Sequence, residues 1–242
     1  MKRILVLSLL LFPVFSMGLE IPSNLTSSHR ERLTELLGPT TSIKPLTHPF
    51  PLGGYDGFEM GLSFETIDVS DLNSLGSGTD KESSLVIPKF TFAKGLYFDL
   101  DVFLEFSPLL RQEKVSEFGL LVRKSLYQSK FYPINISMSV FGSAVNVDNI
   151  FNSESYGFDL TTGITLSDLS LYLGIGQMST SANIIGVKEG VVITDSGADE
   201  SSNIEQLHTV FGMSFSYKNY FLAFQADRFQ IPVYSFKLGY RL

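Results

Sequence analysis

Acidic side chains alternate with apolar ones in the segment 96–107, so this segment places several carboxylates on one face. Asp99, Asp101 and Glu105 occupy one set of alternate positions, and leucine, valine and phenylalanine residues occupy the other. Because side chains alternate across a β-strand, the pattern predicts a strand with one apolar face and one acidic face. A row of carboxylates can attract cations, or pair with basic side chains on neighbouring strands.

The same alternation recurs in ten predicted strands between residues 57 and 242. If the apolar faces point outward, the opposite faces line a common interior. The titratable residues that we expect to line it, as a path for small ions or solutes, are Glu59, Lys89, Asp99, Asp101, Glu105, Glu117, Arg123, Asp159, His208, Lys237 and Arg241. A buried charge is costly unless it is paired or hydrated, so the pattern favours either an ion-pair core or a hydrated path that prefers cations.

The order of the strands predicts which of these charges meet. If ten strands close into a ring, the last pairs with the first, and Arg241 then approaches Glu59. Lys89 and Arg123, on the strands that flank 96–107, are expected to approach the acids of that segment. Because side chains nearly fill a barrel of about eight strands, a ring of ten favours a narrow or plugged barrel over an open pore.

His208 is the interior residue that could act as a general base, with Gln225 and Asp227 as candidate neighbours. A hydrolase also needs a nucleophile or an activated water, and no nucleophilic side chain is predicted beside His208. His29 and His48 lie elsewhere, and the chain has no cysteine, so no metal or cofactor site is predicted. We therefore predict no catalytic residue, with a membrane-embedded hydrolase that uses His208 as the minor alternative.

Residues 1–18 have the features of a secretory signal peptide. Lys2 and Arg3 precede an apolar run, and Ser16 and Gly18 stand at the −3 and −1 positions of the expected cleavage site. Cleavage removes Lys2 and Arg3 from the 18 basic residues but none of the 25 acidic ones, so the formal charge falls from −7 to −9. An acidic exported chain does not fit a nucleic-acid binder. The absence of cysteine excludes disulfides.

Residues 19–56 are predicted to form an N-terminal periplasmic segment with a short helix at 28–37. Ser28 and Glu31 have the spacing of a capping box, and Leu33, Leu36 and Leu37 share one face. A helix of about ten residues is marginal alone in water, so we expect it to pack against the barrel as a plug or lid.

The connections between the predicted strands alternate in length. Short turns are expected at 94–95, 128–130, 167–168 and 218–219, and longer connections at 70–83, 108–114, 146–154 and 179–205. Outer-membrane barrels sort their connections in this way, with the short turns in the periplasm. The last connection, 229–231, is short where a long one is expected. The insert 179–205 also holds a hairpin pattern at 184–194, which could add two strands and make twelve.

Residues 57–242, together with the predicted signal peptide, resemble bacterial outer-membrane β-barrel proteins. The resemblance is carried by the last strand, in which Tyr234, Phe236, Leu238, Tyr240 and Leu242 alternate, although the chain ends in leucine rather than phenylalanine. It implies an all-β fold, a single antiparallel up-and-down barrel in the cell outer membrane. It also implies outer-membrane lipid as surroundings, and recognition of the last strand by the barrel assembly machinery.

Three functional classes follow from these patterns. The first is a narrow or plugged porin-like transport barrel with an acidic lumen, and the second is a structural or adhesive barrel whose loops meet an unidentified extracellular partner. The third is a soluble exported β-protein, which the sorting of the connections disfavours.

Overall fold

The computed structural model describes residues 19, 21–22, 24–40, 42–77, 79, 83–107, 115–184, 186–188, 191–193 and 202–242. The predicted signal peptide, residues 1–18, lies outside this set. No helix in the described part of the chain is long and apolar enough to cross a membrane.

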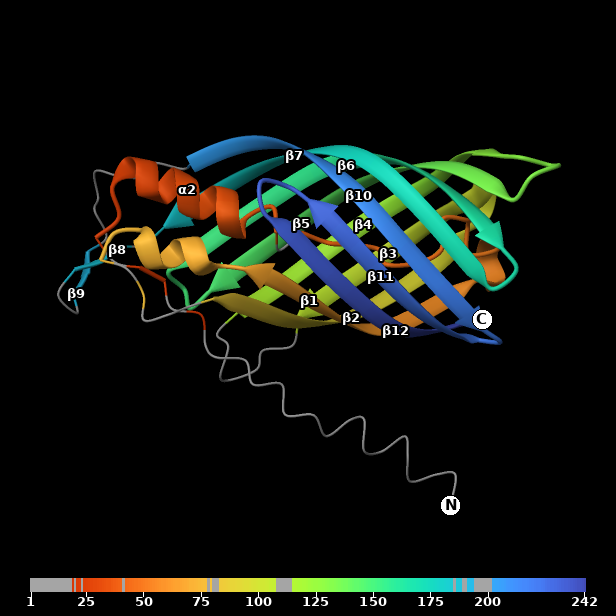
Figure 1. Ribbon diagram of the computed structural model, residues 1–242, viewed down its shortest axis with the longest axis horizontal. Helices are drawn as coiled ribbons and strands as arrows, with labels where there is room; N and C mark the ends of the chain where they lie inside the picture. The colour runs from red at the N-terminus through yellow and green to blue at the C-terminus, as the bar shows by residue number, and fades with distance from the viewer. Residues whose placement is uncertain are drawn as a thin grey trace, which may run out of the picture.

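Ten antiparallel strands close into one barrel (Figure 1), as the alternation predicted. Closure is made by β1 and β12, in the register that brings Glu59 opposite Arg241. The barrel strands are β1 (Phe58–Asp68), β2 (Ser84–Leu96), β3 (Leu100–Ser107), β4 (Val115–Gln128), β5 (Ile134–Val147), β6 (Phe151–Leu166), β7 (Leu169–Ile184), β10 (Ser202–Tyr217), β11 (Tyr220–Arg228) and β12 (Pro232–Arg241).

The hairpin pattern in the long insert does form strands, but they stay out of the barrel. β8 (Gly186–Lys188) pairs only with β9 (Val191–Ile193), as a separate two-stranded sheet. The alternative of twelve barrel strands is therefore wrong. β7 and β10 instead pair directly over most of their length, and so close the ring without the hairpin.

The segment 96–107 is not one strand. A 3-10 turn, η4 (Tyr97–Asp99), separates β2 from β3, and Leu96 pairs with Leu100 across it. Phe98 and Asp99 have positive φ, which Asp tolerates better than most residues. Asp99 is exposed in this turn, so its predicted place in the interior is wrong. The turn expected at 94–95 is wrong for the same reason, since β2 runs on to Leu96.

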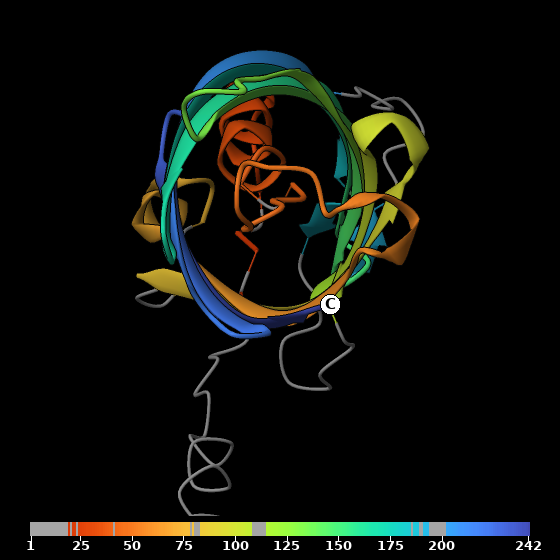
Figure 2. The ribbon, with the colours of Figure 1, turned by 90° about the vertical axis from the view of Figure 1, so that its right-hand side faces the viewer.

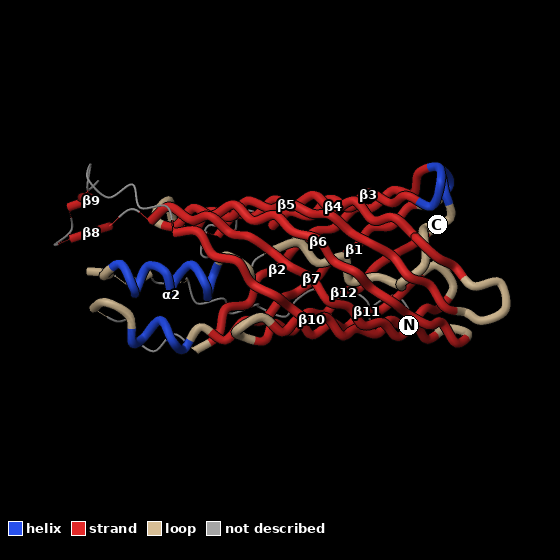
Figure 3. Tube along the Cα trace, turned by 90° about the horizontal axis from the view of Figure 1, so that it is seen from above, coloured by secondary structure: helices blue, strands red, loops and turns tan. Residues whose placement is uncertain are grey.

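Short turns gather at one end of the barrel, which we call the turn end. They are η4, 129–133, 167–168 and 218–219. The opposite, long-loop end carries most of the long connections, including the one that holds η3 (Ser70–Ser74), and it lies beside β8 and β9 (Figure 3). The connection between β5 and β6 shrinks to 148–150, because both strands extend further than predicted.

The outward face of the barrel changes character along its axis. Around the middle it presents exposed apolar side chains, which we call the lipid band: Phe90, Phe92, Leu104, Phe106, Leu120, Met138, Val140, Phe158, Leu160, Leu173, Phe211, Met213, Phe224 and Leu238. Near the long-loop end the same faces carry polar residues, which we call the rim: Ser116, Asn146, Asn152, Glu154, Ser181 and Asn183. A contiguous apolar band with exposed tyrosines at its turn-end edge, such as Tyr97, Tyr127, Tyr217 and Tyr220, is the surface of an outer-membrane barrel.

The described part of the N-terminal segment lies inside the barrel (Figure 2). Its helix, α2 (Ser27–Leu37), sits at the long-loop end against β10 and β7. The chain then passes along the interior to η2 (Gly54–Asp56) at the turn end, where Tyr55 stacks on Tyr97.

The cap of α2 differs from the predicted capping box. Thr26, not Ser28, is the N-cap residue, and its side chain accepts a hydrogen bond from the backbone N–H of His29. Ser28 and Glu31 are exposed, while Leu33, Leu36 and Leu37 are buried. The buried face thus matches the prediction, and the helix begins one residue earlier.

A basic residue placed within the lipid band should cost more than the same residue placed on the rim. We expect Leu160→Arg to lower the free energy of unfolding in lipid vesicles by about 2–4 kcal/mol, because its charge would face hydrocarbon. Asn152→Arg, on the same face of β6 but on the rim, is the matched control, expected to cost about 0–1 kcal/mol. Urea titration followed by far-ultraviolet circular dichroism measures both, and equal costs would contradict the position of the band.

Candidate functional site

Most of the predicted interior charges do project into the barrel. Glu59, Lys89, Asp101, Glu105, Glu117, Arg123, Asp159, His208 and Lys237 are buried there, and Arg241 is partly exposed at the turn end. They do not face an empty lumen, because the N-terminal segment runs between them. The candidate site is therefore the contact between the barrel wall and this segment.

Lys89 is the centre of the largest charge cluster. Its ammonium lies 2.9 Å from Glu65, 3.2 Å from Glu105 and 2.8 Å from Glu117, and all four side chains are at most 1% exposed. Lys44, from the N-terminal segment, reaches the same Glu65 at 2.9 Å. Three carboxylates thus face two ammonium groups, and the cluster keeps one formal negative charge. We call these five residues the carboxylate cluster.

Glu59 forms a second node near the turn end. It accepts hydrogen bonds from Lys237 at 2.8 Å and from Arg241 at 2.8 Å, as the closure of the ring predicted. Thr47 of the segment donates to the same carboxylate at 2.6 Å, and Lys237 donates to the carbonyl of Pro45 at 3.1 Å. The node therefore ties β1 and β12 to the segment as well as to each other.

Asp101 and Arg123 form the third node, also as predicted from the strand order. Arg123 donates to Asp101 through Nε at 3.1 Å and through Nη2 at 2.8 Å. Nη1 donates to the carbonyl of His48 and Nη2 also donates to that of Phe50, each at 2.8 Å, and the N–H of Leu52 donates to Asp101 at 3.0 Å. Arg123 thus binds backbone carbonyls of the segment, and Asp101 binds one of its backbone N–H groups.

Glycines of the wall make room for the segment. A Cβ at Gly119 would lie 2.7 Å from the Cβ of Ile43, and one at Gly163 would lie 2.5 Å from Pro49. Contacts this short exclude any side chain unless the segment moves. The wall is therefore shaped to the segment at two points on different strands.

Sequence reasoning missed the segment's own contribution. Lys44, Thr47 and the carbonyls at 45, 48 and 50 come from the part of the N-terminal segment after the predicted helix, where prolines interrupt any period and no element was predicted. Lys44 is its only charged residue between Pro39 and Asp56, and it is 2% exposed. That lone charge is the one sequence signal that pointed to an interior partner.

His208 has a different neighbour from the one expected. Its Nε2 lies 2.8 Å from Oδ1 of Asp159, although the two atoms are not aligned as a hydrogen bond, and its ring stacks on Phe229 at 4.5 Å. Gln225 donates instead to Asp227 at 2.9 Å. Among the described residues no hydroxyl group is hydrogen-bonded to His208. This geometry supplies a contact between an imidazole and a carboxylate rather than an activated nucleophile.

The interior near the long-loop end is apolar. Inward residues of the wall, including Ile67, Ile87, Val115, Val145, Val147 and Phe151, form one buried cluster with Leu33, Leu36 and Leu37 of α2. We call this part of the interior the apolar compartment. It lies at the level of the rim, so here the barrel is polar outside and apolar inside.

α2 is also held by contacts at the surface of the long-loop end. Arg32 lies 2.7 Å from Asp71 of η3 and 2.5 Å from the amide oxygen of Gln230. The hydrogen bond that Arg32 donates to the carboxylate of Asp71 raises the pKa of Arg32 above its ordinary value. Such exposed pairs contribute little, about 0–1 kcal/mol, so the burial of the leucines dominates the docking of the helix.

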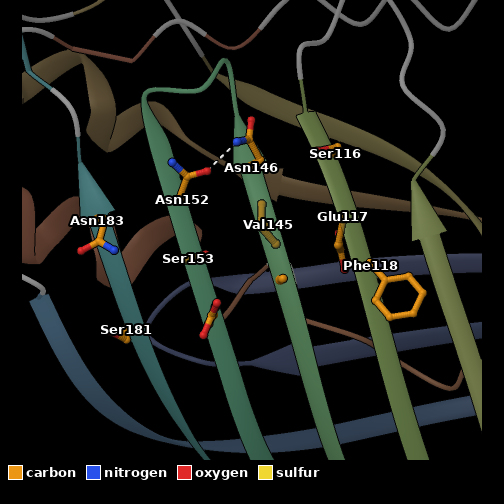
Figure 4. Close-up of a pocket in the computed structure, with 11 residues that line it drawn as sticks. Ser116, Glu117, Phe118, Val145, Asn146, Asn152, Ser153, Ser181 and Asn183 are labelled. Carbon is orange, nitrogen blue, oxygen red and sulfur yellow. Dashed lines mark hydrogen bonds between the residues drawn. The ribbon is translucent and has the colours of Figure 1, made fainter.

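A depression of about 440 Å³ lies over β4 to β7 near the long-loop end (Figure 4). Its lining includes the rim residues Ser116, Asn146, Asn152, Glu154 and Asn183. Asn146 donates to Asn152 within it at 2.5 Å. These amides thus bond to each other across the strand pair.

No family model matches the sequence, and no curated protein matches it. Similar solved structures include an outer-membrane channel from Pseudomonas putida F1, with 10% identity, 83% of this chain and 100% of that chain covered and a TM-score of 0.47. The N-terminal β-barrel domain of Pseudomonas aeruginosa OprF has 9% identity, coverage of 78% and 99% and a TM-score of 0.39. The attachment invasion locus protein Ail of Yersinia pestis has 13% identity, coverage of 77% and 97% and a TM-score of 0.34.

The carboxylate cluster should depend on its central cation. We expect Lys89→Met to lower the free energy of unfolding by about 3–5 kcal/mol, because three buried carboxylates lose their shared partner. Arg32→Ala, which removes an exposed cation, should cost less than about 1 kcal/mol and serves as the control. Urea titration of both variants in the same detergent is the measurement. A cost for Lys89→Met no larger than that of the control would show that the cluster is hydrated.

Proposed function

We propose that this protein is an outer-membrane transport barrel that its own N-terminal segment closes in the resting state. The observation that carries the proposal is the threading of residues 42–52 along the interior, between three charged nodes of the wall. A barrel of ten strands has little space to spare, so a chain inside it closes the path. Transport then requires the segment to move.

The charge of the wall supports a preference for cations once the segment has moved. Among the described residues seven inward acids face four inward bases: Glu59, Glu65, Asp101, Glu105, Glu117, Asp159 and Asp227 against Lys89, Arg123, Lys237 and Arg241. Displacement of Lys44 removes one further positive charge. Acidic walls favour cations in pores. By the sorting of the connections, the long-loop end faces the cell exterior and α2 is the outer closure.

A permanently closed barrel, which acts through its rim and loops, is the second candidate. It is favoured by the completeness of the contacts at the Glu59 and Asp101 nodes, where the segment satisfies side chains of the wall. Recognition of β12 by the barrel assembly machinery stays a prediction under both candidates.

A single disulfide can separate the two candidates. A Cβ at Gly38 would lie 3.3 Å from the Cβ of Thr180, close to the spacing of a disulfide, and the chain has no cysteine of its own. We expect Gly38→Cys/Thr180→Cys to open in planar bilayers only after reduction, with at least a tenfold lower open probability when oxidised. Opened channels should favour K⁺ over Cl⁻, because the wall is acidic.

The control is Ser155→Cys/Thr180→Cys, since these two residues face each other across β6 and β7 and a disulfide there leaves the segment free. Its conductance should not respond to the reductant. Protein lacking residues 19–52 should conduct continuously. If that deletion variant shows the heat-dependent gel shift of a folded barrel and no conductance, the transport proposal is wrong and the permanently closed barrel remains.

A further inference from the structure

The apolar compartment ends directly on the carboxylate cluster. From the long-loop end toward the turn end, each of three strands passes from an apolar inward residue to a charged one. The pairs of successive inward residues are Ile67 and Glu65 on β1, Ile87 and Lys89 on β2, and Val115 and Glu117 on β4. An apolar space with a net negative floor is the complement of a molecule that joins an apolar body to a cation. The apolar compartment and the carboxylate cluster are therefore adjacent, since neighbouring inward positions of the same strands belong to one and to the other.

The floor of the compartment has unused acceptors. Oε1 of Glu65, Oε2 of Glu105 and Oε2 of Glu117 are buried and have no hydrogen-bond partner. A buried carboxylate oxygen without a donor is costly, and the cluster also keeps one formal negative charge. Once Lys44 has left, the three carboxylates face Lys89 alone, and a ligand ammonium would restore the second positive charge and could direct all three of its N–H donors at the carboxylates.

The N-terminal segment already presents this combination of groups. Leu33, Leu36 and Leu37 fill the compartment, and seven residues after Leu37 the ammonium of Lys44 binds Glu65 at 2.9 Å. Lys44 also donates to the carbonyls of Thr40 and Ser42, so its charge is only partly directed at the cluster. The segment thus occupies the place that an apolar cation would take.

We propose that the apolar compartment and the carboxylate cluster form a binding site for an amphipathic amine, an alkyl chain that carries a primary ammonium group. The alkyl chain of the ligand lies in the compartment, and its ammonium group contacts the carboxylates of Glu65, Glu105 and Glu117. α2 and Lys44 are the internal competitor, and the ligand enters as they leave. The proposal rests on the proposed function, since both need the segment to move, and it names the class of solute.

Photolabelling tests the site directly. Protein in phosphatidylcholine nanodiscs is irradiated with hexadecylamine that carries a diazirine in its chain, and labelled residues are identified by peptide mass spectrometry. We expect labels on inward residues such as Val115 and Val145 in the reduced Gly38→Cys/Thr180→Cys protein. Oxidation should lower the inward labels at least tenfold and leave those on the lipid band unchanged.

Competition by unlabelled compounds tests the ammonium group. Hexadecylamine should displace the probe from inward residues at about tenfold lower concentration than hexadecanol, because a charge-assisted hydrogen bond is lost in the alcohol. Glu117→Gln should weaken labelling severalfold, whereas Glu154→Gln, on the rim, should not. Lys44→Met should strengthen it, because the competing ammonium is gone.

The outcomes separate this inference from the transport proposal. Inward labelling without conductance would support the site and reject transport, whereas conductance without inward labelling would reject the site alone. Equal displacement by the amine and the alcohol would overturn the role of the carboxylate cluster. Inward labelling that does not change on oxidation would overturn the competition with α2.

Discussion

Neutralisation of buried charge is the constraint on which the interior depends. The inward face of the wall carries more carboxylates than basic groups, and a closed ring of ten strands leaves little room to hydrate them. Lys89 compensates part of the excess, since it contacts three carboxylates at once. The remainder calls for donors that the wall lacks, and Lys44, Thr47 and the Leu52 N–H supply some of them. The segment is therefore a structural part of the interior as well as its closure.

A second constraint comes from the solvent on each side of the wall. In the lipid band the outward residues are apolar and the inward face carries the charged nodes, whereas at the rim the outward residues are polar and the inward ones apolar. The strands β5, β6, β7 and β10 have 14–16 residues, but a membrane crossing needs only about 9–11. The surplus stands in water and needs an apolar core of its own. In the resting state the leucines of α2 complete that core. The need for it explains why the compartment is apolar and why α2 docks at this end.

The features that follow from the two-residue alternation of β-strands could be predicted from the sequence. The number of barrel strands, the outward apolar faces and the meeting of Glu59 with Arg241 all follow from alternation and closure. Sequence reasoning missed η4, because the alternation of 96–107 continues through residues that form the turn, and only backbone geometry separates them. It also missed Lys44 and Thr47 as partners, because their contacts join positions 12 to 21 residues apart through the interior. The lone charge of Lys44 indicates an interior partner, but local pattern does not say which residue that partner is.

The two constraints together decide how firmly the segment is held. Its contacts at the Glu59 and Asp101 nodes use fixed, directional hydrogen bonds, whereas α2 relies on apolar burial and exposed ion pairs. Apolar burial is non-directional, so another apolar body of similar size can replace it at little cost. The cluster beneath α2 is also the node whose acceptors are left incomplete. Release should therefore begin at the long-loop end, where the occupant can be exchanged, and proceed toward the turn end, where each hydrogen bond lost leaves a buried charge on the wall.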